Sequence, residues 1–185
     1  MELLTRIELP LATPRLQLEP LRRRHAPFLF AALSDPSIYT YIPVDPPVSM
    51  AQLEARFEQL EARHSPDGRE LWLNWAIYDN PTQQYAGLVQ ATIRPEGEAM
   101  LAYELTQGLR GQGIATEACT AVIAELVGYY EVTSLLAYVD TRNTPSIRLL
   151  ERLGFSRVET ILRADYFKGV WSDEFVYQQM VSKEA

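Results

Sequence analysis

The loop that joins a predicted strand to a predicted helix contains two closely spaced glycines, Gly111 and Gly113. A glycine has no Cβ, so the backbone at these positions can approach a ligand closely. The first N–H groups of the helix that begins at Ile114 have no intrahelical partners, and the positive end of the helix dipole attracts anions. The loop therefore predicts a phosphate or pyrophosphate site. Taken alone, the same glycines are equally compatible with a tight turn between a strand and a helix.

The loop does not fit two well-known phosphate-binding motifs. A Walker A loop ends in Gly-Lys-Ser/Thr, and residues 108–115 contain no lysine. A dinucleotide-binding loop needs a third glycine inside a parallel strand–helix–strand unit. Thr116 stands where that glycine belongs, and the preceding strands are predicted to be antiparallel. The first motif is excluded and the second is a poor match.

Cysteine, histidine and metal chemistry is not indicated by the residues. The chain contains one cysteine, Cys119, and two histidines, His25 and His64. A Cys–His nucleophile and a metal centre are therefore not expected. A lone cysteine cannot form an intramolecular disulfide, which favours a cytoplasmic location.

Length and composition indicate one globular domain over residues 1–185. Hydrophobic residues make up 47% of the chain and charged residues 22%, the balance of an ordinary soluble protein. The formal net charge of −7 disfavours non-specific binding to nucleic acid and suits a cationic substrate better. No apolar stretch approaches the roughly 18 to 20 residues of a membrane span, so no membrane association is expected.

The hydrophobic periodicity predicts a mixed α/β fold. Alternating patterns predict strands and 3.6-residue patterns predict helices. Turn residues separate the three central strands, which are therefore expected to pair antiparallel. The segment before Pro14 is expected to pack as an edge strand or arm, and residues 34–48 to form a proline-rich loop with one helical turn. The predicted strands are 15–21, 71–78, 85–93, 99–105, 134–139, 155–161 and 174–181, and the predicted helices are 26–33, 50–64, 114–129 and 145–153.

The loop and three other segments resemble the GCN5-related N-acetyltransferase (GNAT) family. The family's pyrophosphate loop is Arg/Gln-x-x-Gly-x-Gly/Ala, and Arg110, Gly113 and Ala115 match it in place. Residues 111–118, Gly-Gln-Gly-Ile-Ala-Thr-Glu-Ala, are similar to the RimJ/RimL-type branch, which acts on ribosomal proteins. The other similar segments are Thr-Pro-Arg-Leu at 13–16, Asn-Thr-Pro-Ser-Ile at 143–147 and Leu-Leu-Glu-Arg-Leu-Gly-Phe at 149–155. Together they extend the resemblance over about residues 13–181.

The resemblance implies a fold and a cosubstrate. The GNAT fold is a central, mostly antiparallel twisted sheet of about seven strands with about four helices, and its fourth strand, here 99–105, splays away from the fifth, here 134–139. Acetyl-CoA is the implied acetyl donor, with the backbone amides of residues 112–116 around its pyrophosphate and no metal. Glu117, one residue further along, is accounted for by the helix dipole alone. The residues that the resemblance assigns to the cofactor are Tyr103, Leu105, Arg110, Gly111, Gln112, Gly113, Ile114, Ala115, Thr116, Asn143 and Ser146.

Two residues are candidates for catalysis, Glu104 as base and Ser146 as acid. Acetyl transfer needs a neutral amine, and a Glu104 carboxylate facing the cleft accepts the amine's proton directly or through water. The alternative is that Glu104, between two apolar neighbours, only points to solvent. The resemblance places Ser146 near the CoA sulfur, where it protonates the departing thiolate. Many family members use a tyrosine of the same helix instead, and Leu150 occupies that place here. Helix capping is a sufficient structural explanation for Asn143 or Thr144.

These residues predict an acetyl-CoA-dependent N-acetyltransferase in which a primary amine attacks the thioester directly in a ternary complex at the splay. The acceptor is a protein N-terminus or a small-molecule amine (an antibiotic, a polyamine or an amino acid), and a non-catalytic acyl-CoA sensor is the alternative. Residues 26–64 and 166–171 are expected to set the acceptor. Trp72 and Trp75 must face opposite sides of one strand, so one belongs to the core and the other is available to the acceptor cleft. A monomer and a homodimer are both compatible with the sequence.

Overall fold

The computed structural model describes residues 6–182 of the chain. Its strands are β1 (Leu11–Ala12), β2 (Leu16–Pro20), β3 (Leu71–Asp79), β4 (Gln84–Ile93), β5 (Glu98–Leu105), β6 (Ser134–Asp140), β7 (Ser156–Phe167) and β8 (Val170–Met180). Its α-helices are α2 (Ala26–Leu33), α3 (Met50–Leu60), α4 (Ile114–Tyr129) and α5 (Thr144–Arg152), and its short 3-10 helices are η1 (Arg23–His25), η2 (Pro36–Tyr39) and η3 (Gln107–Leu109). The order of elements is the predicted one, and η2 is the helical turn expected within residues 34–48.

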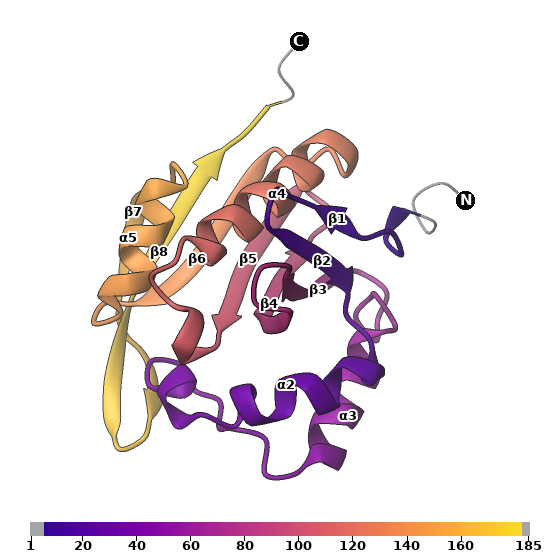
Figure 1. Ribbon diagram of the computed structural model, residues 1–185. Coiled ribbons are helices and arrows are strands. Elements are labelled where there is room, and N and C mark those ends of the chain that lie inside the picture. Colours follow the sequence, from indigo (N-terminus) through magenta and orange to yellow (C-terminus); the bar gives the residue numbers. More distant parts are fainter. Residues whose placement is uncertain (1–5, 183–185) are drawn as a thin grey trace.

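The strands form one sheet of eight in the order β1-β2-β3-β4-β5-β6-β8-β7 (Figure 1). All neighbours are antiparallel except β5 and β6, which are parallel. A parallel pair needs a crossover connection, which α4 supplies. The predicted mixed α/β fold with a mostly antiparallel sheet is confirmed, and the two-residue β1 is the edge strand expected before Pro14.

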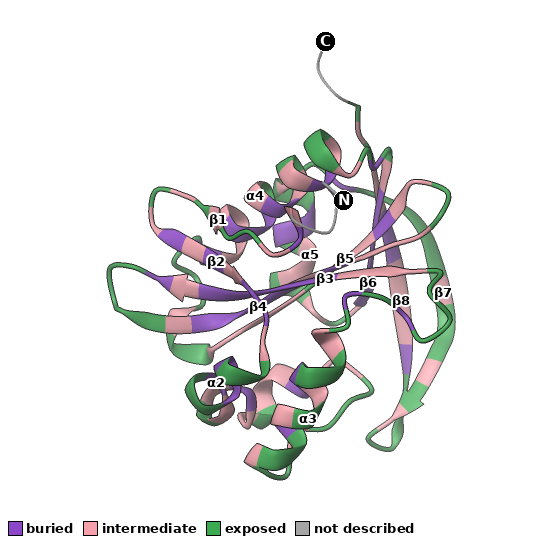
Figure 2. Cartoon of the chain, turned by 90° about the vertical axis from the view of Figure 1, so that its right-hand side faces the viewer, coloured by how far each residue is buried: buried purple, intermediate pink, exposed green. Residues whose placement is uncertain are grey.

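Helices cover both faces of the sheet, with α4 and α5 on one face and α2 and α3 on the other (Figure 2). Successive side chains of a strand point to opposite faces. In β3, Trp75 and Ile77 therefore join the core under α4, whereas Ala76 joins the core under α2 and α3. From α4, Val122 and Leu126 are fully buried in the first core, where each such side chain contributes about 1.5–3 kcal/mol of hydrophobic stabilisation.

The sheet opens between β5 and β6. The two strands pair at three positions only, Glu98 with Ser134, Ala99 with Leu135 and Met100 with Leu136. Within the described chain, the remainder of β5 makes no pairs with the remainder of β6. The backbone edge of residues 101–105 that faces β6 is therefore available to a ligand, and the predicted splay is confirmed.

A glycine brings the backbone of β4 close to β5 beside this opening. Gly87 lies opposite Leu105 and has a φ of 145°, and a Cβ built on it would lie 2.0 Å from the carbonyl oxygen of Glu104. No side chain fits at that distance, so the close approach requires glycine. The contact fixes the backbone of Glu104 at the point where β5 has left β6.

Helix α3 ends at Leu60, four residues before the predicted end at His64. Arg63 has a φ of 63°, which a right-handed helix cannot continue. His64 instead forms an isolated antiparallel bridge with Leu71, so the chain after α3 already belongs to the sheet.

The last two strands are longer than predicted. The prediction ends one strand at Ile161 and begins the next at Glu174, whereas β7 and β8 continue to a tight turn at Lys168 and Gly169. Both turn residues have positive φ, 52° and 80°, which is typical of two-residue hairpin turns. Most side chains of β7 are exposed and its register with β8 shifts after Ile161. The extension therefore lacks the alternating hydrophobic pattern that reveals a strand.

Candidate active site

The glycine loop opens the first turn of α4. Gly113 is the N-cap residue of α4 in the left-handed conformation, with a φ of 80°, and Gly111 has a φ of 77°. No side chain of the described chain caps this helix end. The first-turn amides, from Ile114 to Thr116, are therefore free to bind an anion. This is the geometry that the sequence predicts for a pyrophosphate site.

An ion-pair network fixes the loop to the turn between β1 and β2. The Glu117 carboxylate accepts hydrogen bonds from Thr13 Oγ1 at 2.6 Å, from the Arg15 backbone N–H at 3.0 Å and from Arg15 Nε at 2.7 Å. Arg15 Nη1 donates to the carbonyl oxygen of Gln112 at 3.1 Å. Burial raises the pKa of Glu117, but the hydrogen bonds from Thr13 and Arg15 outweigh it and the net shift is downward. Glu117 is thus a structural anchor of the loop. The interaction with the helix dipole, which the sequence indicated, does not account for this role.

Arg110 and Gln112 make contacts within the loop itself. Arg110 Nε donates to the carbonyl oxygen of Leu105 at 3.2 Å, and Gln112 Nε2 donates to that of Gly108 at 3.1 Å. Both side chains are exposed. The Arg110 guanidinium therefore joins the end of β5 to the loop and leaves its other N–H groups accessible.

Glu104 lies on the face of β5 away from α4. Its side chain is 12% exposed, and Arg56 Nη2 from α3 lies 3.4 Å from its Oε1. Its Oε2 is buried and has no hydrogen-bond partner among the described residues. Burial, followed by the nearby Glu104 charge, raises the pKa of Tyr39 to about 12. Glu104 therefore does not simply point to solvent: it is a carboxylate with one oxygen paired and one oxygen free.

Tyr103 and the start of α5 meet on the opposite face. Tyr103 Oη donates to the carbonyl oxygen of Ser146 at 3.4 Å, and burial raises the pKa of this phenol. Asn143 Oδ1 accepts from the Ser146 backbone N–H at 3.3 Å, which is the predicted cap. Leu150 is 1% exposed within the core and supplies no polar atom. Glu104 and Ser146 thus lie on opposite sides of β5, and no contact joins them.

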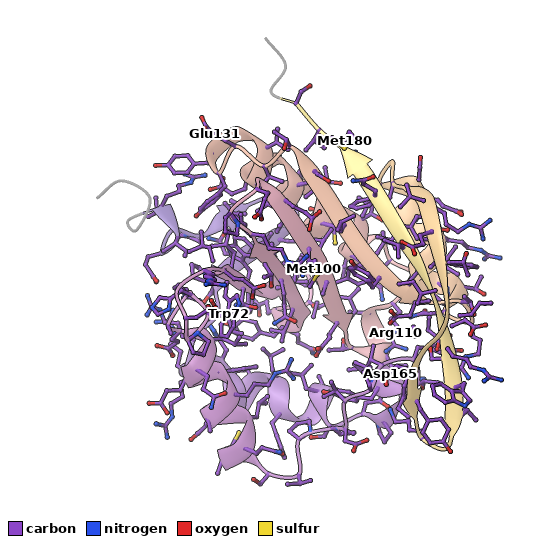
Figure 3. All side chains as sticks on the ribbon, turned by 180° about the vertical axis from the view of Figure 1, so that it is seen from behind. Trp72, Met100, Arg110, Glu131, Asp165 and Met180 are labelled. Carbon is purple, nitrogen blue, oxygen red and sulfur yellow. The ribbon has the colours of Figure 1, made fainter. Side chains whose placement is uncertain are left out.

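A cavity of about 250 Å³ lies on the Glu104 side of the sheet. Figure 3 shows Trp72 and Met100, two of its lining residues, on this face. Trp75 is buried in the core under α4, so the predicted division between the two tryptophans is confirmed. The polar and aromatic residues in the cavity wall are Trp72, Asn74, Gln90, Thr92 and Tyr138.

The two segments expected to set the acceptor contact each other. Lys168 Nζ, at the tip of the β7–β8 hairpin, donates to the carbonyl oxygens of Tyr39, of Ile42 at 3.1 Å and of Val44 at 3.4 Å. The hairpin tip is thereby held against the loop between η2 and α3. No sequence pattern indicated this contact, because its partners are backbone groups 124 to 129 residues away.

Cys119 is fully buried in α4, and burial raises the pKa of its thiol to about 12. Such a thiol does not form the thiolate that nucleophilic catalysis needs. Within residues 6–182, no three His, Cys, Asp or Glu side chains lie close enough together to hold a metal ion. No helix in the same range is long and apolar enough to cross a membrane.

A helix end with uncapped amides lies on one side of the open strand pair, and the Glu104 carboxylate lies on the other. A family model described as an acetyltransferase (GNAT) domain matches residues 15–156. The chain belongs to this family and is an N-acetyltransferase. GNAT acetyltransferases use acetyl-CoA.

Known proteins with similar sequences and structures agree with this assignment. The chain is 28% identical over 160 residues to the uncharacterized N-acetyltransferase p20 of Bacillus licheniformis, covering 85% of this chain and 87% of that protein. A GNAT-family acetyltransferase from Bacillus anthracis superposes with a TM-score of 0.79 at 16% identity, covering 93% of this chain and 98% of that one. RimL, the ribosomal L7/L12 α-N-protein acetyltransferase, in complex with coenzyme A, superposes with a TM-score of 0.84 at 18% identity over 95% of this chain and all (100%) of its own. These structural likenesses show the GNAT fold.

Proposed function

We propose that this protein transfers the acetyl group of acetyl-CoA to a primary amine by direct attack in a ternary complex at the β5–β6 splay. The observation that carries the proposal is the two-sided site around β5. The helix end with free amides lies on one side, and Glu104 presents a free carboxylate oxygen on the other. Donor and acceptor approach from these two sides and meet at the opening.

The donor binds along the loop and the open edge of β5. The amides of residues 112–116 hold the pyrophosphate, and the free N–H groups of Arg110 lie near the phosphates. The pantetheine arm pairs with the backbone edge of residues 101–105 and contacts Asn143. The open helix end and the unpaired strand edge support this placement.

The chemical step is attack of the amine nitrogen on the thioester carbonyl carbon. Glu104 Oε2 takes the amine's proton, directly or through water, as the C–N bond forms. The backbone N–H of Leu105 stabilises the developing charge on the carbonyl oxygen. The C–S bond then breaks, and the Ser146 hydroxyl passes a proton to the CoA thiolate while it takes one from solvent. Glu104 returns its proton to solvent. The free Oε2 of Glu104 supports the first of these roles, and the position of Ser146 at the start of α5, beside Tyr103, supports the last.

The acceptor is a protein N-terminus in the first instance, which the fold shared with the ribosomal-protein acetyltransferase RimL supports. A small-molecule amine is the second candidate. An acyl-CoA sensor without an acceptor would have no use for the free Glu104 oxygen and the adjoining cavity, and these two features favour the enzyme.

Replacement of Glu104 and Ser146 tests the mechanism. Removing a general base costs about 10²- to 10⁴-fold in rate, so Glu104→Gln is expected to lower kcat by about 100-fold or more while CoA affinity is retained. Ser146→Ala is expected to lower kcat by about tenfold. Glu98→Gln, on the same face of β5 and bound to Arg94, is the control and leaves kcat unchanged. If Glu104→Gln and Ser146→Ala each retain native kcat across the pH range, these residues are not the base and the acid.

A further inference from the structure

The cavity on the Glu104 side adjoins the place where the acceptor amine would react. It is lined by Ala102 and Met100, which precede Glu104 by two and four residues on the same face of β5. A strand rises about 3.3 Å per residue, so the cavity begins about 7 Å from Glu104 and extends to about 13 Å. If the amine of a peptide acceptor lies at Glu104, the peptide chain that extends from this amine would reach the cavity within two residues.

The wall of the cavity has no charged side chain. Its nine lining residues are apolar, aromatic or neutral and polar. Glu70, which accepts a hydrogen bond from Trp72 Nε1 at 3.1 Å, is already paired with Arg94 at 3.6 Å. An ammonium group placed in the cavity would therefore lose hydration without gaining an unpaired carboxylate in the wall, which is costly. The chain as a whole is acidic, which suits a cationic substrate, but no acidic residue lines this cavity.

A pair of side-chain amides crosses the cavity floor. Gln90 Nε2 donates to Asn74 Oδ1 at 2.7 Å, from adjacent strands. Asn74 is 5% exposed and is held in place by the sheet around it. No other hydrogen bond to either amide is found among residues 6–182, and neither amide has a buried unpaired atom. One amide N–H₂ and one amide oxygen thus remain accessible from the cavity, a donor and an acceptor at a fixed spacing.

We propose that this cavity is the acceptor subsite and that it selects amines that carry an uncharged, hydrogen-bonding group within two residues of the reacting nitrogen. Asn74 and Gln90 bind that group through their free donor and acceptor, and Trp72 and Tyr138 cover it with their aromatic faces. The substrate class is a peptide N-terminus with neutral polar side chains, not a polyamine or an aminoglycoside. The inference rests on the proposed acetyl transfer and on Glu104 marking the position of the amine.

Matched acceptors test the selectivity of the native chain. The probes are the peptide amides Thr-Asn-Ala-Ala and Arg-Arg-Ala-Ala, each with one α-amine and no other acylatable amine, and spermidine. The neutral peptide is expected to have a kcat/KM at least about tenfold above the other two, since a site built on hydrogen bonds disfavours a group that leaves them unpaired. Equal values for the two peptides, or a preference for the cationic acceptors, would overturn the inference.

Variants at Gln90 test the assigned wall. Gln90→Leu is expected to lower kcat/KM for the neutral peptide about tenfold, and Gln90→Glu to raise the relative kcat/KM of the arginine peptide, since it adds a carboxylate partner. Gln59→Glu, the same change of charge on the exposed side of α3, is the control. The CoA dissociation constant, measured by calorimetry, shows that each variant retains the donor site. Unchanged acceptor preference in both Gln90 variants would also overturn the inference.

The outcomes separate this inference from the proposed function. Absence of transfer to the neutral peptide overturns the inference. If polyamines, amino acids or aminoglycosides are acetylated in its place, the proposed function stands with a different acceptor. If CoA binds and none of these amines is acetylated, the proposed function fails as well.

Discussion

The two sides of β5 offer ligands different kinds of groups. On the α4 side these are backbone amides at a helix end, and their geometry comes from Gly111, Gly113 and the anchor between Arg15 and Glu117. On the α3 side they are side chains contributed by separate elements, such as Glu104 of β5 and Gln90 of β4. A backbone site depends on conformation, whereas a side-chain site depends on which residues are present.

This difference predicts how each side responds to substitution. On the donor side, changes should act through loop conformation or charge and alter CoA affinity. On the acceptor side, they should alter turnover or acceptor choice and leave CoA affinity unchanged.

Gly113→Glu is expected to weaken CoA binding by about 100-fold or more, equivalent to about 2.7 kcal/mol. A side chain at this position would start 3.4 Å from Arg15 Nη2. Its carboxylate would add negative charge at the helix end where the pyrophosphate would bind, and like charges brought together cost several kcal/mol. Calorimetry with CoA measures the effect. Gly169→Glu is the matched control, because Gly169 also has a φ of 80° but lies at the hairpin tip, where a Cβ would meet no atom within 4 Å. Native affinity in Gly113→Glu, or no CoA binding by the native chain, would contradict the donor site.

Arg56→Gln is expected to lower kcat by about tenfold without changing the CoA dissociation constant. Arg56 acts through Glu104 as a positioning residue, and a hydrogen bond to a charged group is worth about 1.5–3 kcal/mol. Arg56→Lys, which keeps the positive charge beside Glu104, should restore most of kcat. A fall in kcat that Arg56→Lys does not reverse would mean that the charge of Arg56 is not what positions Glu104.

Glu117→Gln is expected to lower the free energy of unfolding at pH 7 by about 1–2 kcal/mol, because it removes the charge that Thr13 and Arg15 bind. The folded pKa of Glu117 lies below its ordinary value of 4.5. The carboxylate's stabilisation is therefore complete above that value and is lost as the pH falls through the folded pKa. Denaturant unfolding at several pH values measures it.

The difference in the free energy of unfolding between the native chain and Glu117→Gln should thus fall toward zero as the solution is acidified. Glu96→Gln, at an exposed turn position, is the control and should match the native chain throughout. A difference that stays constant with pH would mean that the anchor does not depend on the Glu117 charge.

The sequence predicted the donor side because its signals are local. The glycine loop, the start of α4 and the cap at Asn143 are each contained in a few consecutive residues, where hydrogen-bonding rules act over short distances. The family resemblance predicted the splay between β5 and β6, and the strand register confirms it.

The acceptor side was predicted only in outline because its contacts join distant residues. Arg56 and Glu104 are 48 residues apart, and Lys168 and Tyr39 are 129 apart. The hydrophobic periodicity of a sequence does not indicate which side chains of separate elements contact each other. The β7–β8 extension was missed for a related reason, since its exposed side chains follow no hydrophobic pattern.

The smallest expected effect lies at the rim of the acceptor side. Lys168→Met removes the hydrogen bonds from Nζ to the carbonyl oxygens of Tyr39, Ile42 and Val44. Partly exposed contacts of this kind contribute about 0.5–1.5 kcal/mol each at most, and the backbone carbonyls regain water when the lysine is absent.

We therefore expect Lys168→Met to lower the stability by less than about 1 kcal/mol and to raise the acceptor KM about threefold, equivalent to about 0.6 kcal/mol. The CoA dissociation constant should not change, because no hydrogen bond among residues 6–182 joins the Lys168 side chain to the α4 loop. Lys168→Arg, which keeps the charge and the donors, should behave as the native chain in steady-state kinetics. If Lys168→Met instead weakens CoA binding, the hairpin tip communicates with the donor loop, and the two sides of β5 are not independent.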